Sequence, residues 1–381
     1  MEGASTEEFA QIPAPGRPGA TQLAQFFIPA AASLQERRPR TLKHGDTFAV
    51  FDHNGDAHEG PGSPEGLYHR DTRYLSRLYL TLDGARPMLL SSTLRDDNAT
   101  LTCDLTNPDV HDASSRLVLR HDVIHMRRSR FLWDATCFER VGVRNFDQVP
   151  RSLRLEVAFA ADFVDIFEVR GTTRKRRGIL HPPEVAESSV RLAYTGLDKR
   201  RRETSLRFDP APRKLSGDRA VFMLHLAPRQ TFYLFIEIHC GTVATDLAPR
   251  RGYFIALRDA RRALRASSSR ATAIVTSNEI FNEVVRRSIS DLYMLITDTA
   301  AGPYPYAGIP WFSTVFGRDA LITALETLWL DPSQARGVLG YLAAEQAQRV
   351  DPAADAEPGK ILHEVRQVEM AELGEVKFRR Y

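Results

Sequence analysis

The stretch "RSLRLEVAFA" at residues 151–160 places apolar side chains at every second position, at Leu153, Leu155, Val157 and Phe159. Successive side chains of a β-strand point to opposite faces, so a period of two gathers these four residues on one face. An α-helix would need apolar residues three and four positions apart. The stretch therefore predicts a β-strand that buries one face in a core.

Similar runs occur on both sides of this stretch, and they are rich in Val, Leu, Phe, Tyr and Thr. Examples are "RLVLRHDVIHM" (116–126) and "QTFYLFIEIHC" (230–240), and turn signals such as Asp83-Gly84 separate the runs. About ten strands at this spacing, with no helical pattern between them, are typical of an antiparallel β-sandwich. The sequence predicts this sandwich for residues 36–252.

Charge is spread along the chain, and its total is small. Hydrophobic residues make up 43% of the chain and charged residues 26%, as in an ordinary globular protein, and the formal net charge is +3. A nucleic-acid-binding protein usually concentrates its basic residues on one face, so this distribution argues against nucleic acid as a partner. Two basic runs, "RGTTRKRRGIL" (170–180) and "LDKRRRE" (197–203), are interpreted as solvated loops.

The three cysteines, Cys103, Cys137 and Cys240, are far apart and odd in number. They match no metal-site spacing, so the sequence predicts buried thiols in a reducing compartment, with neither a metal nor a cofactor. No run of about 18 apolar residues and no signal peptide is present. The sequence therefore predicts a cytoplasmic protein without a membrane partner, and it leaves the oligomeric state open. Residues 1–35, rich in Ala, Gly and Pro, are expected to be a flexible leader.

A helical pattern follows the predicted sandwich. A linker helix is expected over residues 253–275. In "TSNEIFNEVVRRSISDLYMLIT" (276–297) the apolar residues recur at helical spacing, and Ser277 or Asn278 can cap the start. These residues predict an amphipathic helix.

Two further helices are predicted downstream. One starts near Arg318, and Asp331-Pro332 caps and starts the other, which is expected to continue to Val350. Three amphipathic helices are too few to close a core of their own. Residues 276–381 are therefore expected to be an incomplete domain.

The stretch "PYAGIPWFSTVFGRDA" (305–320) joins a loop to a helix start. Its prolines exclude a helix in the first half, whereas its second half favours one. A helix N-terminus offers unpaired N–H groups and a positive end, and Trp311, Phe312, Arg318 and Asp319 gather beside it. Sugar recognition uses such a set, because a ring covers the apolar C–H face while Arg and Asp hold adjacent hydroxyls. Two interpretations stay open: a sugar site, or an Asp319 helix cap beside a core Trp311.

A second dense patch, "GKILHEVRQVEMAELGE" (359–375), is rich in glutamate. Inverting glycoside hydrolysis requires two carboxyl groups on opposite sides of a sugar, with space for a water. Glu364, beside His363 and Arg366, is interpreted either as one of these groups, as a substrate contact, or as a structural residue. The other glutamates are interpreted as a solvated acidic face: Glu369, Glu372 and Glu375.

The stretch "GLYHRDTRYLSRLYLTLDG" (66–84) is dense in polar and aromatic residues at a strand entry. Either this loop reaches the edge of a neighbouring site, or an Asp–Arg network fixes it to its own sheet, and the second interpretation is favoured. The sequence contains no Gly-rich phosphate loop, no G-x-S-x-G elbow and no H-E-x-x-H motif, so those chemistries have no support.

Taken in order, these motifs resemble the bacterial glycogen-debranching, amylo-α-1,6-glucosidase-like family. The hallmark of its N-terminal domain is a D-x-x-G run followed by G-L-[FY]-x-R-D-T-R-x-L-S, which this chain matches between Asp52 and Ser76. The stretch "AGIPWFSTVFGRDALITA" (307–324) is similar to the start of the family's catalytic toroid, a six-hairpin (α/α)6 glycosidase domain. The resemblance extends over about residues 40–381.

The resemblance implies a multidomain β + α architecture, in which an antiparallel β-sandwich precedes the first helices of the toroid. It implies a carbohydrate substrate, an α-glucan or related glucoside. It also implies that Arg318 and Asp319 bind the nonreducing sugar, with Asp319 either a binding residue or the general acid. The other residues implied at the site are Trp311, Phe312, His363 and Arg366, with Glu364 as a second candidate for catalysis.

The predicted function is an inverting glycoside hydrolase of the debranching type, of which this chain is the N-terminal part. The helices predicted here are fewer than the toroid requires, so the remaining catalytic carboxylate is expected further along, and the chain alone is expected to have little or no hydrolase activity. Two alternatives stay open. One is a noncatalytic carbohydrate-binding or scaffold module, and the other is a glycoside phosphorylase, which uses phosphate in place of the activated water.

Overall fold

A computed structural model describes residues 39–376 apart from 61, 96–97, 243–246 and 353. The predicted leader at residues 1–35 lies outside the described residues. The strands up to residue 145 are β1 (Arg40–His44), β2 (Thr47–Phe51), β3 (Gly66–His69), β4 (Thr72–Leu75), β5 (Arg77–Leu82), β6 (Met88–Leu94), β7 (Leu101–Thr106), β8 (Val110–His111), β9 (Leu117–Leu119), β10 (Ile124–Trp133) and β11 (Thr136–Asn145).

The remaining strands are β12 (Arg151–Ala160), β13 (Ile179–Leu180), β14 (Glu184–Val185), β15 (Ser189–Thr195), β16 (Arg201–Asp209), β17 (Lys214–Leu215), β18 (Arg219–Leu226), β19 (Thr231–Cys240), β20 (Ile296–Thr299) and β21 (Gly302–Pro305). The helices are α2 (Ile166–Val169), α3 (Pro249–Ser268), α4 (Glu279–Leu295), α5 (Gly317–Glu326), α6 (Pro332–Ala344) and α7 (Glu369–Glu372).

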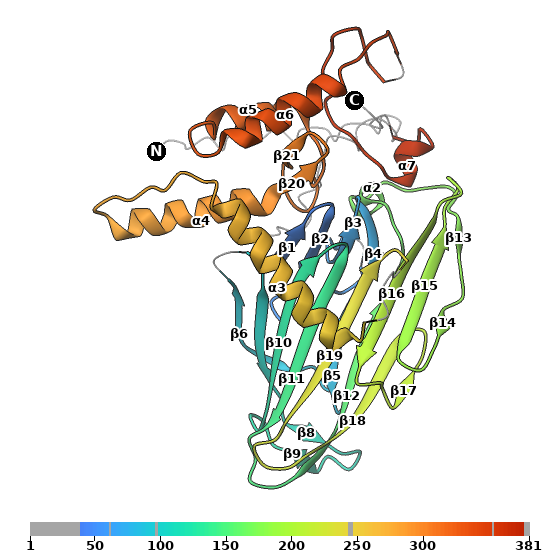
Figure 1. Cartoon of the computed structure of the whole chain (residues 1–381). Coiled ribbons are helices and arrows are strands. Elements are labelled where there is room, and N and C mark those ends of the chain that lie inside the picture. Colours follow the sequence, from blue (N-terminus) through green and yellow to red (C-terminus); the bar gives the residue numbers. More distant parts are fainter. Residues whose placement is uncertain (1–38, 61, 96–97, 243–246, 353, 377–381) are drawn as a thin grey trace, which may run out of the picture.

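The described strands form antiparallel sheets only. The largest runs β13-β15-β16-β19-β11-β10-β7-β6, with β14 beside β15, and a second runs β17-β18-β12-β5. A small sheet, β1-β2-β3-β4, lies at one end of these two, and the pairs β8–β9 and β20–β21 are separate (Figure 1). The prediction of an antiparallel β-sandwich is confirmed.

The sandwich core forms where the two larger sheets face each other. The stretch 151–160 is strand β12, and its alternate residues Leu153, Leu155, Val157 and Phe159 are all buried in this core, as predicted. The ring of Phe159 lies 6.0 Å from that of Phe208 on β16 in the opposite sheet. Burial of such side chains on both inner faces is the main force that holds two sheets together.

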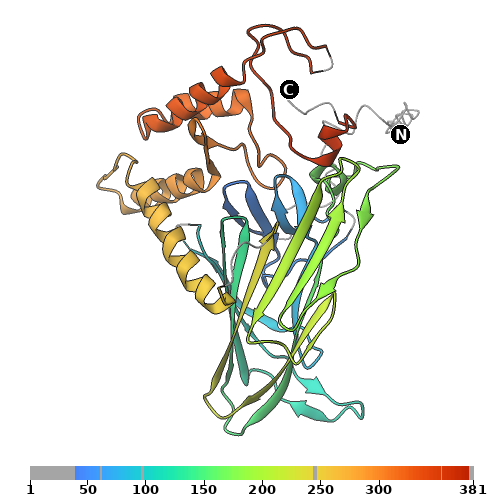
Figure 2. The same cartoon turned by 45° about the vertical axis from the view of Figure 1, so that its right-hand side comes forward.

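Helix α3 lies along the outer face of the larger sheet (Figure 2). Its Tyr253 and Ala256 pack against Phe131, Phe138 and Phe235, which come from β10, β11 and β19. The helix therefore covers an apolar part of a sheet face, and it leads the chain to the end of the sandwich where the small sheet lies (Figure 1).

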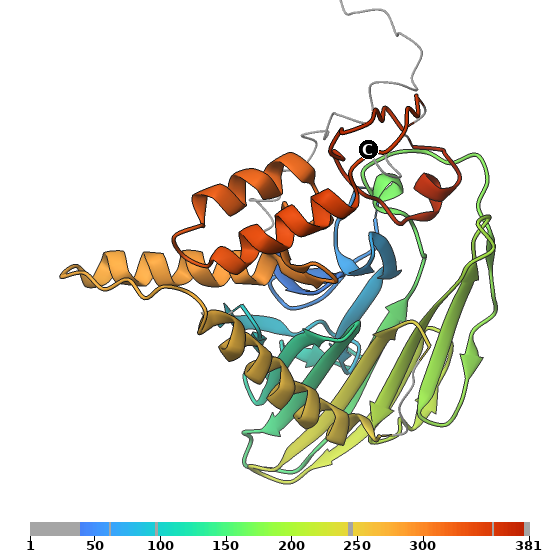
Figure 3. The ribbon, with the colours of Figure 1, turned by 45° about the horizontal axis from the view of Figure 1, so that its top comes forward.

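Helices α4, α5 and α6 gather beyond that end (Figures 1 and 3). The side chain of Asn278 caps α4 and that of Asp331 caps α6, as predicted. Helix α6 ends at Ala344, so the prediction that it continues to Val350 is wrong. The backbone there turns back instead, and the amide of Ala347 donates to the carbonyl of Lys360.

The helical part has a small core of its own, with Tyr304, Tyr306, Val338 and Leu342 among its members. Several apolar side chains of its helices nevertheless face outward. They include Ile280, Phe281 and Val284 on α4, Leu325 on α5 and Leu339 on α6.

Candidate functional site

The two motif patches of the helical part lie side by side. The amide of Gly317 donates to the carbonyl of His363 at 2.9 Å, and that of Val365 donates to Val315 at 3.1 Å. A Cβ on Gly317 would lie 2.1 Å from the carbonyl oxygen of Leu362, so only glycine allows the two backbones to approach this closely. The glycine of the Gly-Arg-Asp motif therefore fixes the 359–375 patch beside the start of α5.

Arg318 and Asp319 project from the first turn of α5. Their side chains are 72% and 40% exposed, and a distance of 3.7 Å separates the Arg318 guanidinium from the Asp319 carboxylate. The capping position of α5 is Phe316, which supplies no side-chain cap. Asp319 thus interacts with the positive end of the helix without capping it, and both charged groups are accessible to a ligand.

The two predicted aromatic residues differ in burial. Trp311 is half-buried and packs against the apolar cluster between the small sheet and α7. Phe312 is 37% exposed, and its ring lies edge-on to that of Phe316 with centroids 5.8 Å apart. The Arg170 guanidinium, from the sandwich, lies 5.8 Å from the Phe312 ring. Of the two, Phe312 offers the more accessible ring.

Arg366 is almost fully buried and holds two carboxylates. Its guanidinium lies 2.8 Å from the carboxylate of Asp71 and 2.9 Å from that of Glu364, and it also donates to the carbonyl of Trp311 at 3.1 Å. The rings of Phe167 and Phe316 flank it. Burial raises the pKa of Asp71, and the Arg366 charge opposes this rise.

Asp71 belongs to the turn between β3 and β4, so the "RDTR" loop has two roles. Arg70 pairs with Asp46 in the β1–β2 turn of the same sheet, and Arg73 pairs with Asp162, which follows β12 of the second sheet. Asp71 instead reaches Arg366, which is 295 positions away in the sequence. The loop therefore contacts the neighbouring patch as well as its own sheet.

His363 is half-buried, and its ring lies edge-on to Phe316 with centroids 5.8 Å apart. Its backbone also joins the two patches, through the bond from the amide of Gly317. Glu364 is buried, and its carboxylate is held by Arg366. The structure thus places Glu364 and Arg366 beneath the surface and leaves Arg318 and Asp319 on it.

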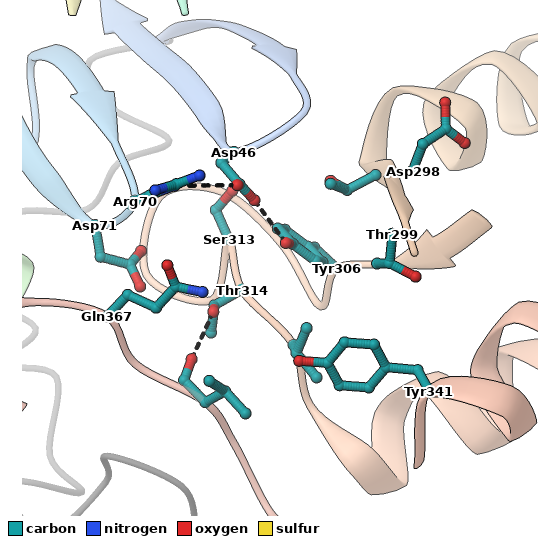
Figure 4. Close-up of a pocket in the computed structure, with 13 residues that line it drawn as sticks. Asp46, Arg70, Asp71, Asp298, Thr299, Tyr306, Ser313, Thr314, Tyr341 and Gln367 are labelled. Carbon is teal, nitrogen blue, oxygen red and sulfur yellow. Dashed lines mark hydrogen bonds and ion pairs between the residues drawn. The ribbon is translucent and has the colours of Figure 1, made fainter. Parts of the chain in front are cut away.

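A pocket of about 190 Å³ lies beside this group (Figure 4). The predicted site residues do not line it, although their sequence neighbours do. Its walls come from two hairpin turns of the small sheet, from β20 and from the loop before α5. The lining residues are Asp46, Arg70, Asp71, Thr297, Asp298, Thr299, Tyr306, Ser313, Thr314, Val315, Tyr341, Val365 and Gln367.

Hydrogen bonds join the pocket walls to each other. The hydroxyl of Tyr306 donates to Asp46 at 2.7 Å, and Arg70 donates to the other oxygen of Asp46 at 3.5 Å. Behind the wall, Lys43 donates to the hydroxyl of Thr297 at 2.7 Å. Burial lowers the pKa of Lys43 to about 7, although Asp46 and Asp298 oppose this. Sequence reasoning missed this pocket, since single residues in separate turns leave no spacing signal.

The basic loops and the acidic patch neutralise each other. Arg174 lies 3.0 Å from Glu369 and 2.7 Å from Glu375, and Arg200 lies 3.4 Å from Glu372. The interpretation of Glu369 as part of a solvated face is wrong, because that side chain is buried against the sandwich. The prediction of solvated basic loops is wrong at Arg174 for the same reason.

Among the residues that the structure describes, one group of side chains has donor atoms close enough to hold a metal ion: Asp52, Asp56 and His58. Both carboxylates already pair with arginines, since Arg86 contacts Asp52 and Asp56, and Arg128 contacts Asp56. Asp52 also accepts the amides of Asn54 and Asp56, which closes the turn of the D-x-x-G motif. The group is thus a structural anchor for this turn.

The fold now defines a class of protein: an antiparallel β-sandwich with a helical part at one end. A human-microbiome protein assigned as a kojibiose phosphorylase has a similar structure, with a TM-score of 0.55 at 8% identity over 80% of this chain and 46% of that one. A bacterial glucoamylase, solved with acarbose, is more distant, with a TM-score of 0.44 at 12% identity over 79% and 48%. This chain therefore spans about half the length of both proteins.

The sequence assigns the family within that class. Residues 42–237 match the family of the N-terminal domain of some glycogen debranching enzymes, and the chain belongs to this family. The resemblance predicted from the motifs is confirmed. Comparison with curated proteins gives no match. Among the described residues, no helix is both long enough and apolar enough to cross a membrane.

Proposed function

We propose that the chain is a glycoside hydrolase of the amylo-α-1,6-glucosidase, debranching type, which acts on α-glucans or related glucosides with inversion. The observation that carries this proposal is the backbone pairing at Gly317 and His363. It brings the exposed Arg318 and Asp319 beside a buried carboxylate–arginine group at an open helix N-terminus. Family membership supports a glucan as the substrate.

Each residue has a proposed role. Arg318 and Asp319 hold adjacent hydroxyls of the nonreducing sugar, and Asp319 is also the candidate general acid. Phe312 and Trp311 cover the apolar face of the ring. Beneath them Glu364 and Arg366 keep the two segments in register, and His363 lies at the edge of the site.

The proposed division of the chain keeps residues 36–252 as the sandwich and 276–381 as the first part of a six-hairpin (α/α)6 domain. The linker helix predicted at 253–275 is α3, which begins at Pro249 and ends at Ser268. The outward-facing apolar residues of α4, α5 and α6 support the last assignment, because a larger helical domain would cover them. Inversion requires a second carboxyl group about 6.5–9.5 Å from the first. Since Arg366 engages Glu364, we assign water activation to a further helix of the toroid.

The fold shared with the kojibiose phosphorylase supports a second candidate, a glycoside phosphorylase. Both candidates use the same sugar contacts and differ in the attacking group. Dependence of glucan cleavage on inorganic phosphate separates them. We further propose a cytoplasmic location, which the three buried free cysteines support.

Binding of maltooligosaccharides to the whole chain tests the proposal. The double variant Arg318→Ala/Asp319→Asn should bind at least tenfold more weakly than the wild type, because two charge-assisted contacts are lost. Arg258 and Asp259 form a matched control, since they are also an adjacent Arg-Asp ion pair on a helix surface.

Equal binding by the Arg318→Ala/Asp319→Asn variant and the wild type in calorimetry contradicts the proposed site. Weakening by Arg258→Ala/Asp259→Asn to the same extent contradicts it too. Glucose release from a branched glucan is measured in parallel, and we expect little or none from this chain. Substantial release would overturn the assignment of the second carboxylate to a further helix.

A further inference from the structure

The pocket beside the proposed site has lining atoms that lack a partner within the described residues. One oxygen of the Asp71 carboxylate and the hydroxyl of Ser313 are buried without a hydrogen bond. Asp71 is 2% exposed and Ser313 4%. An unsatisfied buried polar atom costs about 1–3 kcal/mol, so such atoms in one pocket indicate an occupant that bonds to them.

The turn that supplies Asp71 is held in an unusual conformation. Arg70 and Asp71 are consecutive and both have positive φ, at 47° and 60°. Glycine and asparagine adopt this conformation most readily in a two-residue hairpin, and arginine does so at a cost. The turn therefore keeps two charged side chains on the pocket wall where a less strained turn would use small residues.

The charges of the pocket favour a neutral ligand. Arg366 divides its single positive charge between Asp71 and Glu364, and Arg70 pairs with Asp46, whose second oxygen accepts from Tyr306. A divalent cation needs several free oxygen ligands, and three of the six carboxylate oxygens of Asp46, Asp71 and Asp298 already accept hydrogen bonds, from Tyr306, Arg70 and Arg366. An anion would meet the remaining charge of Asp298.

The volume of the pocket and the arrangement of its walls limit the kind of ligand further. A drug-sized ligand occupies a site of about 300–1,000 Å³, and this pocket measures about 190 Å³. Figure 4 shows Asp71 and Gln367 on one side, and Thr299 and Tyr341 on the other. Tyr306 and Tyr341 supply aromatic surface, and the hydroxyls of Ser313 and Thr299 supply hydrogen-bonding groups.

We propose that this pocket binds a single pyranose ring, whose hydroxyls bond to the free oxygen of Asp71 and to Ser313. The small sheet of the sandwich and the helical part build the site together. It is separate from Arg318 and Asp319, which do not line it. The choice of a sugar among small neutral polyols rests on the proposed function.

Ser313→Ala tests the proposal in the whole chain, with methyl α-D-glucopyranoside as the probe in calorimetry. Ser76→Ala is the matched control, because its hydroxyl is also buried and unpartnered but lies away from the pocket. We expect Ser313→Ala to weaken binding about three- to tenfold, the effect of one lost hydrogen bond. Ser76→Ala should bind the probe as the wild type does.

Gln367→Trp is a second variant, whose bulk should block the pocket. Its side chain is exposed, so folding should not depend on it. Loss of binding in Gln367→Trp supports the proposal even if Ser313→Ala does not fold. Absence of saturable binding to the wild type overturns it and leaves a pocket filled by water alone. Unchanged binding by both pocket variants also overturns it.

The result of the pocket test can be distinguished from the result of the maltooligosaccharide test of the proposed function. A glucoside that binds in a Ser313-dependent manner, together with maltooligosaccharide binding that ignores Arg318 and Asp319, supports the pocket and contradicts the proposed function. Maltooligosaccharide binding that depends on Arg318 and Asp319, together with glucoside binding that does not depend on Ser313, contradicts the pocket proposal alone.

Discussion

Two charged clusters lie within one short segment of the chain and differ in how completely they are satisfied. At Arg366, the guanidinium holds Asp71 and Glu364, and one oxygen of Asp71 accepts no hydrogen bond from the part of the chain that the structure describes. At Glu369, both carboxylate oxygens are engaged, by Arg174, by the amide of Leu197 and by the hydroxyl of Tyr194. The first of these clusters adjoins the pocket described above, which Asp71 lines.

The difference shows that buried charge alone does not mark a site. The Glu369 cluster clamps α7 onto the sandwich, and each of its central carboxylate oxygens accepts at least one hydrogen bond. The Arg366 cluster also joins two parts of the molecule, but it presents an unused acceptor. The distinguishing mark is an unsatisfied group in a cavity, rather than the number of charges.

The largest effect is expected for Arg366→Met. This change leaves Asp71 and Glu364 buried without their counter-ion, and the free energy of unfolding should fall by about 3–5 kcal/mol. Urea denaturation measures it. Arg70→Met is the control, since its ion pair is exposed and should contribute less than about 1 kcal/mol. A loss below about 1 kcal/mol for Arg366→Met would show that the cluster does not hold the two parts together.

A pH effect is expected at Asp165, which lies between the clusters and accepts from the amide of Met370. Burial raises its pKa to about 7, with help from the charges of Asp71 and Glu168 and against the amides of Phe167 and Met370.

The folded state therefore binds a proton between about pH 4 and 7 that the unfolded state has released. Protonated Asp165 makes its full contribution to the free energy of unfolding below about pH 4. This contribution is lost as the pH rises to about 7. Asp165→Asn should remove a slope worth about 2–4 kcal/mol in total, at about 1.4 kcal/mol per pKa unit. Unfolding free energies at several pH values measure this slope.

Asp331→Asn is a control, because the pH dependence that Asp331 gives to the unfolding free energy has the opposite sign. Asp331 also caps a helix, but hydrogen bonds from Ser333 and Tyr293 outweigh burial and lower its pKa. Its stabilising contribution is present above the unfolded pKa and is lost as the pH falls through the folded one. Parallel pH profiles for Asp165→Asn and Asp331→Asn would contradict the assigned directions.

The smallest effect is expected for Glu369→Gln in the other cluster. The amide keeps one acceptor oxygen, and Arg174 retains Glu375, so the loss should be about 1–2 kcal/mol. Glu372→Gln, whose partner Arg200 is exposed, should change stability by less than about 0.5 kcal/mol. A loss at Glu369 as large as that of Arg366→Met would remove the distinction between the clusters. Thermal and urea unfolding provide the readout.

The sequence predicted the features that local patterns carry. The alternation in β12 placed Leu153 and Phe159 in the core, and the family motif identified the sandwich. The prolines before α5 excluded a helix there, and residues 302–305 form strand β21 instead. Each of these features is encoded by residues a few positions apart.

The clusters could not be predicted in this way, because their partners are distant in the sequence. Arg174 and Glu369 are 195 positions apart, and each run looks solvated when it is considered alone. The pocket depends on turns that meet only after the sandwich and the helical part pack together. Asp46 and Tyr341 line it without belonging to any motif.

The segment from Leu362 to Val376 has a consequence for the order of synthesis. Its first half pairs with the loop before α5, and its second half is held by Arg174 of the sandwich. Arg174 leaves the ribosome 201 residues before its partner Glu375. Domains generally fold as they are made, so the sandwich can form early while its basic loops wait for this segment. The pocket wall at Val365 and Gln367 is therefore among the last parts of the described chain to be completed.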